Sequence, residues 1–212
     1  TMHYISPSIW AWRGGRIKNI AEAVSHMLVI FPFEEEIYRK AGIPATYVGH
    51  PLAQVIPMQP DVEAAREELG LEADARVVTI LPGSRMSELK YNTTAFIATA
   101  KLLLQRDPHL QFLVPMVGPK QRAYYSELVL AAELDEVPIL LMDGKSHTAI
   151  AAADVVLVAS GTASLEVALY KKPMVIAYKM MAASWHVLKH MGYQPWIGLP
   201  NIMAEEFLVP EF

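Results

Sequence analysis

Short apolar runs that alternate with helix-like stretches constrain the fold of this chain more than any other feature. The runs occupy residues 77–81, 112–115, 138–141, 155–158 and 174–177. Each is too short to cross a membrane, and several are rich in β-branched residues, which is typical of strands buried in a parallel sheet. The helical stretches lie around residues 96–104, 121–132, 146–153 and 163–171, and Asp61 is placed to cap a further helix that ends at Gly70. The alternation predicts an α/β fold with a doubly wound, Rossmann-like parallel sheet.

Charge, cysteine content and the placement of histidines narrow the class of protein. The 212 residues include 18 basic and 22 acidic side chains, a net charge of −4, so no positive field favours binding to nucleic acid. The absence of cysteine excludes a disulfide framework, and the 7 histidines are scattered without the spacing of a zinc site. Charged residues interrupt every apolar stretch before it reaches the length of a membrane span. We therefore expect a soluble or peripheral protein that holds no metal.

A turn after the run at 155–158 suits an anion. Ser160-Gly161-Thr162 leads from this run into the helical stretch at 163–171, so unpaired N–H groups of a helix N-terminus lie at the carboxyl edge of the sheet. Glu166 follows Thr162 by about one helical turn, where its carboxylate can accept hydrogen bonds from the two hydroxyls of a ribose. The alternative is an ordinary strand-to-helix turn in which Thr162 caps the helix and Glu166 complements its dipole.

Two other strand ends carry polar residues. In the turn at 81–88, Gly83 permits a close approach, Ser84 donates a hydroxyl, and Arg85 offers two parallel hydrogen bonds to a phosphate. Tyr178-Lys179 follows the run at 174–177. Two anion-compatible turns on one sheet predict a single diphosphate held between them. Neither turn has the glycine pattern of a dinucleotide-binding loop or a P-loop, and no serine lies in the frame of a hydrolase nucleophile.

The first part of the chain has a different character. Trp10 and Trp12 lie beside Arg13 and Arg16 in an amphipathic, cationic segment that suits an anionic or lipid partner. The alternative is a pair of packed tryptophans beside a solvated basic face. The proline-rich stretch at 51–60 is the best linker, which divides the chain into residues 1–50, the linker 51–60 and a main domain at 61–212. The first residues resemble neither a signal peptide nor a natural beginning, so we expect a fragment.

Several motifs together resemble lipid-A-disaccharide synthase, and they run in order over the whole chain. They are Tyr4-Ile5-Ser6-Pro7-Ser8-Ile9-Trp10-Ala11-Trp12-Arg13, Phe31-Pro32-Phe33-Glu34, Gly49-His50-Pro51, Leu81-Pro82-Gly83-Ser84-Arg85, Ala159-Ser160-Gly161-Thr162, Leu199-Pro200-Asn201 and Val209-Pro210-Glu211-Phe212. The resemblance implies a GT-B glycosyltransferase, with residues 61–212 as an incomplete C-terminal UDP-sugar-binding domain and residues 1–50 as a remnant of the N-terminal, acceptor-side domain. It implies inverting transfer of 2,3-diacylglucosamine from its UDP donor to 2,3-diacylglucosamine 1-phosphate in lipid A synthesis, without a metal ion or other cofactor.

The resemblance also implies roles for single residues. The donor UDP-binding residues would be Gly83, Ser84, Arg85, Glu88, Ser160, Gly161, Thr162, Ser164, Glu166 and Asn201. The acceptor or membrane side would carry Trp10, Trp12, Arg13 and Arg16. The protein would be cytoplasmic, peripheral on the anionic inner face of the bacterial inner membrane, and a homodimer at full length. The general base would belong to the N-terminal domain ahead of this sequence, so no catalytic residue is assigned, and we expect this chain to bind UDP without turnover.

Two alternatives stay open. One is another GT-B enzyme that uses a UDP-sugar, such as the transferase of the peptidoglycan lipid intermediate or a UDP-N-acetylglucosamine 2-epimerase. The Trp-Ala-Trp-Arg segment and the Leu-Pro-Gly-Ser-Arg turn argue against it. The other is a non-catalytic nucleotide-binding module in which Arg85 and Glu166 form a structural ion pair.

Overall fold

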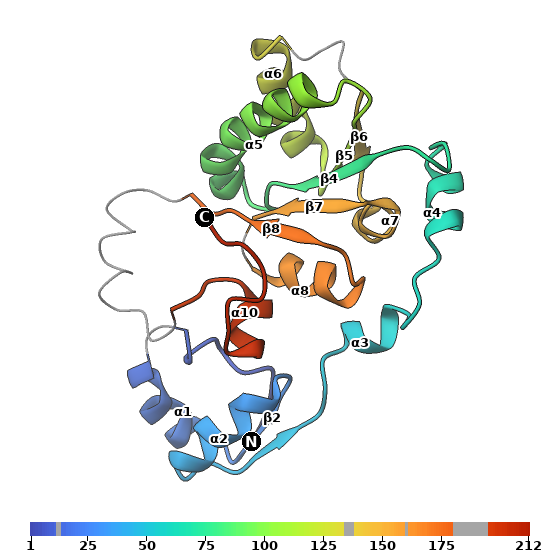
Figure 1. Cartoon of the computed structure of the whole chain (residues 1–212). Helices are drawn as coiled ribbons and strands as arrows, with labels where there is room; N and C mark the ends of the chain where they lie inside the picture. Colours follow the sequence, from blue (N-terminus) through green and yellow to red (C-terminus); the bar gives the residue numbers. More distant parts are fainter. Residues whose placement is uncertain (12–13, 134–137, 160, 180–194) are drawn as a thin grey trace. The chain divides into compact units, whose positions relative to one another are not determined.

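The computed structural model describes residues 1–11, 14–133, 138–159, 161–179 and 195–212. The chain forms two compact units, one built mainly from residues 1–57 and one from residues 58–179 and 196–212 (Figure 1). The division falls inside the proline-rich stretch at 51–60, which also contains a short helix, α3 (Leu52–Val55). The roles of the two units as acceptor-side and donor-side domains stay a prediction.

A small parallel sheet forms the centre of the first unit. Its strands are β1 (Met2–Tyr4), β2 (His26–Val29) and β3 (Ala45–Tyr47), in the order β1-β2-β3. The 3-10 helix η1 (Gly14–Arg16) and the helices α1 (Ile17–Ala23) and α2 (Pro32–Lys40) belong to the same unit. Pro32 is the first residue of α2, a position that suits proline because the N–H of the first helical residue has no partner within the helix. The buried core consists of Ile9, Met27, Val29, Tyr38 and Ile43.

The second unit contains the predicted parallel sheet. Its strands are β4 (Val77–Leu81), β5 (Gln111–Met116), β6 (Ile139–Asp143), β7 (Val155–Val158) and β8 (Met174–Ile176). They lie in the order β6-β5-β4-β7-β8, and all pairs are parallel. The α/β, doubly wound prediction is confirmed. Because the chain spreads from β4 to β6 and then returns to the other side of β4, the strand order reverses between β4 and β7, where ligands bind in such sheets.

Helices connect these strands. They are α4 (Val62–Glu68), α5 (Met86–Arg106), α6 (Pro119–Ala131), α7 (Ser146–Ala152), α8 (Thr162–Leu169) and α10 (Leu199–Ala204). Asp61 caps α4 as predicted, because its Oδ1 accepts a hydrogen bond from the Ala64 amide at 2.9 Å. Figure 1 shows α5 and α6 together on one side of the sheet and α8 on the other. The last residues run beside β8 and pair with it in parallel through Ile176 and Glu211.

The centre of the second unit's core is β4. It lies between β5 and β7, and all of its residues are buried, which explains its uninterrupted apolar sequence. Its one polar side chain is satisfied, because the Thr79 hydroxyl donates a hydrogen bond to the Ala149 carbonyl at 2.7 Å. Around β4 pack Leu89, Phe96, Ile97, Ala100, Phe112, Val114, Met116, Tyr125 and Val129.

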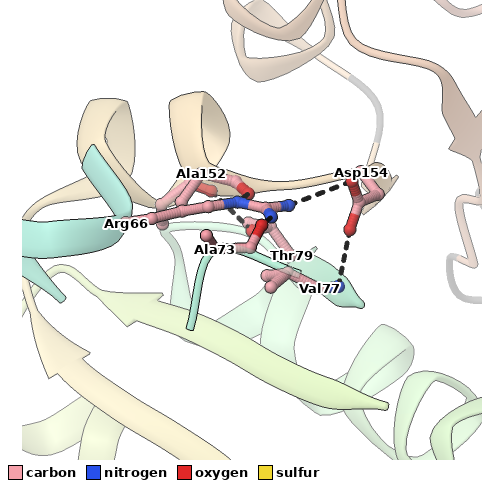
Figure 2. A network of polar contacts seen from close by, with 7 residues as sticks. Arg66, Ala73, Val77, Thr79, Ala152 and Asp154 are labelled. Carbon is pink, nitrogen blue, oxygen red and sulfur yellow. Dashed lines mark hydrogen bonds and ion pairs between the residues drawn. The ribbon is translucent and has the colours of Figure 1, made fainter. Parts of the chain in front are cut away.

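Arg66 joins several segments at the amino edge of the sheet (Figure 2). Its Nε donates to the Ala152 carbonyl at 3.2 Å, and its Nη2 donates to Asp154 Oδ1 at 3.0 Å. The other oxygen of Asp154 accepts from the Val77 amide at 2.8 Å, at the start of β4. The network therefore ties α4 and the end of α7 to the beginnings of β4 and β7, at the edge opposite the two predicted anion turns.

Candidate functional site

The turn between β4 and α5 has a shape that depends on Gly83 and Glu88. Gly83 has a φ of +114°, and a Cβ placed there would lie 2.6 Å from Glu88 Cβ and 2.7 Å from Glu88 Oε2. The Glu88 carboxylate accepts hydrogen bonds from the Ser84 amide at 2.9 Å and the Arg85 amide at 3.1 Å. This is a carboxylate three residues into the helix that satisfies unpaired N–H groups at its start. The turn is thus folded around the Glu88 side chain, which leaves no room for a side chain at position 83.

Arg85 points outward from this turn. Its Nη1 lies 2.9 Å from Glu88 Oε1, yet the Arg85 side chain is 79% exposed while that of Glu88 is 14% exposed. The ion pair therefore holds one nitrogen and presents the rest of the guanidinium to solvent. Among the predicted donor residues, Arg85 is positioned to meet an anion, whereas Glu88 is occupied with the turn itself. A direct contact of Glu88 with a ligand stays a prediction.

The turn between β7 and α8 begins at Gly161. This residue has a φ of +120°, and it, not Thr162, is the N-cap of α8. Because glycine has no side chain to accept hydrogen bonds from the first N–H groups of the helix, these groups can bind an anion instead. Ser164 is fully buried, and its hydroxyl donates to the Gly161 carbonyl at 2.8 Å, so it supports the turn from within. Ser160 lies outside the described residues.

The two turns lie side by side. β4 and β7 are neighbours in register, with Leu81 opposite Val158, and the Ala159 amide donates to the Leu81 carbonyl at 2.8 Å. Gly83 and Gly161 therefore follow adjacent strands at one edge of the sheet, where the strand order reverses. The topology brings together the two strand ends that the sequence singled out.

Asn92 links the third polar strand end to this edge. It is buried on α5, its Oδ1 accepts from the Lys179 amide at 2.8 Å, and its Nδ2 donates to the Pro82 carbonyl at 3.5 Å. Burial raises the pKa of the Tyr178 phenol; the charge of Glu88 raises it further and that of Arg85 lowers it. Asn92 was missed in the sequence, although an amide three residues after Leu89 on an apolar helix face is a usable signal.

Glu166 lies beside a histidine that the sequence did not indicate. Its Oε2 is 3.3 Å from His147 Nε2, and the two side chains are 21% and 38% exposed. The His147 ring contacts that of Tyr170, with centroids 5.7 Å apart. Burial raises the pKa of the Tyr170 phenol, and the charge of Glu166 adds to this effect. Glu166 thus has a defined neighbour on α7 while remaining open to solvent.

Both polar atoms of the Asn201 side chain are hydrogen-bonded within the chain. It is fully buried on α10; its Nδ2 donates to the Val209 carbonyl and to Glu211 Oε1, and its Oδ1 accepts from the Leu208 and Val209 amides. Glu211 also accepts from the Gly198 amide at 2.8 Å, at the start of α10. Asn201 therefore fastens the final residues of the chain to α10, and its predicted contact with a donor sugar or diphosphate stays a prediction.

In the first unit, Trp10 fits the alternative of a packed aromatic residue. Its indole N–H donates to Glu34 Oε1 at 3.1 Å, and its ring meets Phe31 and Phe33 edge-on at 6.2 and 5.2 Å. Glu34 is 1% exposed and also accepts from the Phe31 amide at 3.0 Å. Arg16 is exposed at the end of η1, whereas residues 12 and 13 lie outside the described part.

The described residues also bear on other kinds of site. Arg85 pairs with Glu88 and Glu166 lies beside His147, so the Arg85–Glu166 ion pair of the nucleotide-module alternative is not the one formed. Among the residues that the structure describes, no cluster of three or more histidine and acidic side chains is placed to hold a metal ion. No helix in this part of the chain is both long enough and apolar enough to span a bilayer.

Comparison with known proteins gives a consistent result. The family model described as lipid-A-disaccharide synthetase matches residues 1–212. The lipid-A-disaccharide synthase of Methylobacillus flagellatus is 54% identical over 211 residues, which cover 100% of this chain and 56% of that protein. That of Aromatoleum aromaticum is 55% identical over 99% of this chain and 54% of the relative. The chain therefore spans about half the length of the curated relatives it matches.

Solved structures resemble the fold at low sequence identity. The pneumococcal O-GlcNAc transferase GtfA, solved with UDP and GlcNAc, has a TM-score of 0.51 at 15% identity, over 83% of this chain and 37% of that one. A glycosyltransferase from Rickettsia africae has a TM-score of 0.50 at 12% identity, over 86% of this chain and 51% of that one. These likenesses support the GT-B-type α/β fold alone.

Proposed function

This chain belongs to the lipid-A-disaccharide synthase family, and on that premise we propose that it forms the donor-binding part of a glycosyltransferase. The whole enzyme would transfer 2,3-diacylglucosamine from its UDP donor to 2,3-diacylglucosamine 1-phosphate, with inversion at the sugar carbon, and release UDP. The observation that carries the proposal is the pair of turns at Gly83–Arg85 and Gly161–Thr162, which follow the adjacent strands β4 and β7.

The leaving group in this reaction is a diphosphate whose negative charge grows as the sugar departs. Arg85 supplies an exposed guanidinium, and the start of α8 supplies backbone N–H groups and the positive end of a helix dipole. Such fixed donors stabilise developing charge without having to reorganise. These groups take the role that a metal ion has in other transferases, and the proposal follows the family resemblance in using none.

Glu166 is proposed to select the nucleoside. A carboxylate accepts hydrogen bonds through two oxygens, so it can receive both hydroxyls of a ribose. Its position one turn into α8, on the helix whose start would bind the diphosphate, supports this role, and its partial exposure leaves it accessible. Gly83 and Gly161 would approach the diphosphate through backbone and Ser84 through its hydroxyl, while Glu88 and Ser164 would support the two turns from inside. Asn201 would act from α10, through the segment that it holds in place.

The acceptor and membrane side is proposed for the first unit. Arg16 is exposed there and suits an anionic headgroup or a 1-phosphate. Trp12 and Arg13, which the resemblance also assigns to this side, lie outside the described residues. Trp10 would contribute by packing, because its N–H is bound to Glu34. The general base is not assigned to any residue of this chain, so we propose that the chain alone binds UDP without forming the disaccharide. Membrane attachment and dimer formation are proposed for the full-length protein only.

Calorimetric titration with UDP tests the proposal, with ADP as the nucleotide control. We expect saturable binding that prefers UDP and that weakens in Arg85→Ala and Glu166→Ala. Arg76→Ala is the matched control, because Arg76 is also exposed and paired with a carboxylate, Asp107, but at the amino edge of the sheet. Equal binding of ADP, or equal loss in the Arg76 variant, would contradict the assignment. Disaccharide formation by the chain alone would refute the statement on turnover.

A further inference from the structure

The position of His147 is set by the backbone around it. Gly144 follows β6, and its amide donates to the Met116 carbonyl at 2.8 Å. Lys145 has a φ of +56° as the N-cap of α7, and its Nζ lies 2.9 Å from Glu68 Oε1. His147 therefore lies in the first turn of a helix whose start is fastened at the carboxyl edge of the sheet.

Two contacts join His147 to α8 and to the residue that follows it. Its Nε2 is 3.3 Å from Glu166 Oε2, and its ring lies against that of Tyr170, the C-cap of α8. Nε2 of His147 lies within ion-pair distance of Glu166 Oε2, and because a carboxylate oxygen only accepts hydrogen bonds, a hydrogen bond between the two would be donated by His147. The contact with the Tyr170 ring limits rotation of the imidazole. His147 is thus held within reach of one oxygen of Glu166.

A neighbour in this position restricts the rotamers of Glu166 but leaves its carboxylate able to accept hydrogen bonds from a ligand. Each carboxylate oxygen offers two acceptor positions, so Oε2 can bind His147 and still receive a ligand hydroxyl, and Oε1 stays available for a second one. A free glutamate side chain has several rotamers, and ordering it on binding costs free energy. A neighbour that fixes the rotamer beforehand removes part of this cost.

We propose that His147 is a positioning residue that holds Glu166 ready to accept the 2′- and 3′-hydroxyls of the donor ribose. The inference rests on the proposed function, because it assumes that Glu166 binds the ribose. It assigns no role to His147 in the chemistry of transfer. The competing explanation is that His147 only joins α7 to α8, in which case its loss would affect every ligand of the second unit equally.

The test compares UDP with 2′,3′-dideoxy-UDP, which lacks both hydroxyls, in calorimetric titrations of the 212-residue chain. We expect His147→Ala to weaken UDP binding about tenfold, the size of effect seen when a supporting residue behind a ligand-binding side chain is lost. Binding of dideoxy-UDP should change by less than about twofold. His147→Gln, whose amide can still donate to Glu166, should retain most of the UDP affinity, and His109→Ala, an exposed histidine on another turn, should match the wild type.

The outcomes separate the two proposals. If Glu166→Ala removes the preference for UDP over dideoxy-UDP and His147→Ala adds nothing to it, the two residues act as one unit. Equal losses for both nucleotides in a His147→Ala variant that melts at the wild-type temperature would overturn this inference alone. If the wild-type chain binds neither nucleotide, the proposed function fails and the inference fails with it.

Discussion

Replacing Gly83 with alanine tests whether the β4–α5 turn is built around Glu88. A Cβ at this position would lie 2.6 Å from Glu88 Cβ and 2.7 Å from Oε2, so the glutamate must move. Moving it removes its hydrogen bonds to the Ser84 and Arg85 amides. Hydrogen bonds to a charged group contribute about 1.5–3 kcal/mol each, and a non-glycine residue held at positive φ costs about 1–3 kcal/mol.

Gly161 provides the matched control. Its φ of +120° is close to the +114° of Gly83, but a Cβ there would meet nothing within 4 Å. Backbone strain should therefore act on both positions, and the loss of Glu88 contacts on Gly83 alone. We expect Gly83→Ala to lower the free energy of unfolding of the second unit by at least about 4 kcal/mol, the strain plus the two lost hydrogen bonds, and Gly161→Ala by the strain alone, about 1–3 kcal/mol.

Urea unfolding followed by circular dichroism measures the two losses. Amide hydrogen exchange at Ser84 and Arg85 adds a local readout, since both N–H groups are bound to Glu88 in the structure. Exchange there should quicken in Gly83→Ala and stay unchanged in Gly161→Ala. Equal losses of stability in the two variants, with unchanged exchange at both amides, would refute the packing of Glu88 beneath the turn.

Three further predictions concern polar side chains in and around the cores. Arg66→Met should lower the free energy of unfolding by about 1–3 kcal/mol in urea denaturation, because the Ala152 and Ala73 carbonyls lose their donor and the half-exposed Asp154 loses its ion pair; a loss below about 0.5 kcal/mol would contradict the importance of the contacts drawn in Figure 2. Asn92→Leu should cost about 1–3 kcal/mol in the same assay, because the Lys179 amide loses its acceptor, and thermal stability equal to the wild type would count against it. Burial raises the pKa of Glu34, so its contribution to stability is full below the unfolded value of about 4.3 and declines as the pH rises through the folded pKa. The stability of the wild type relative to Glu34→Gln should therefore fall from about pH 4 to neutral, and a rise over that range would show the sign to be wrong.

The sheet of the second unit could be predicted because each of its strands contains a run of apolar residues. β4 and β7 begin and end at the predicted residues: β4 is buried along its whole length, and β7 consists of Val155-Val156-Leu157-Val158 without a polar position. In the first unit, β1 and β3 escaped prediction: β1 is exposed and consists of Met2-His3-Tyr4, which has no strand pattern. A short exposed strand leaves little trace in a sequence.

The turns could be located, but not all of their contacts. Gly83 and Arg85 could be identified because the conformation of a turn depends on the residues of the turn itself. Asn92 and His147 could not, because they contact Lys179 and Glu166, which lie far away in the sequence. The predicted contact of Asn201 rested on a motif, and a motif does not reveal that the amide is bound to the chain's last residues. Side-chain partners of this kind depend on how helices pack, which sequence periodicity does not specify.

The central claim is that one diphosphate is held between the two turns at the reversal of strand order. Backbone amide resonances of the chain, followed during a titration with UDP, test this most directly. The account predicts that the Gly83, Ser84 and Arg85 amides and the Gly161 and Thr162 amides shift together with a single dissociation constant, while the amides around Arg66 at the opposite edge do not. Shifts confined to one turn, or centred on the Arg66 edge, would contradict it.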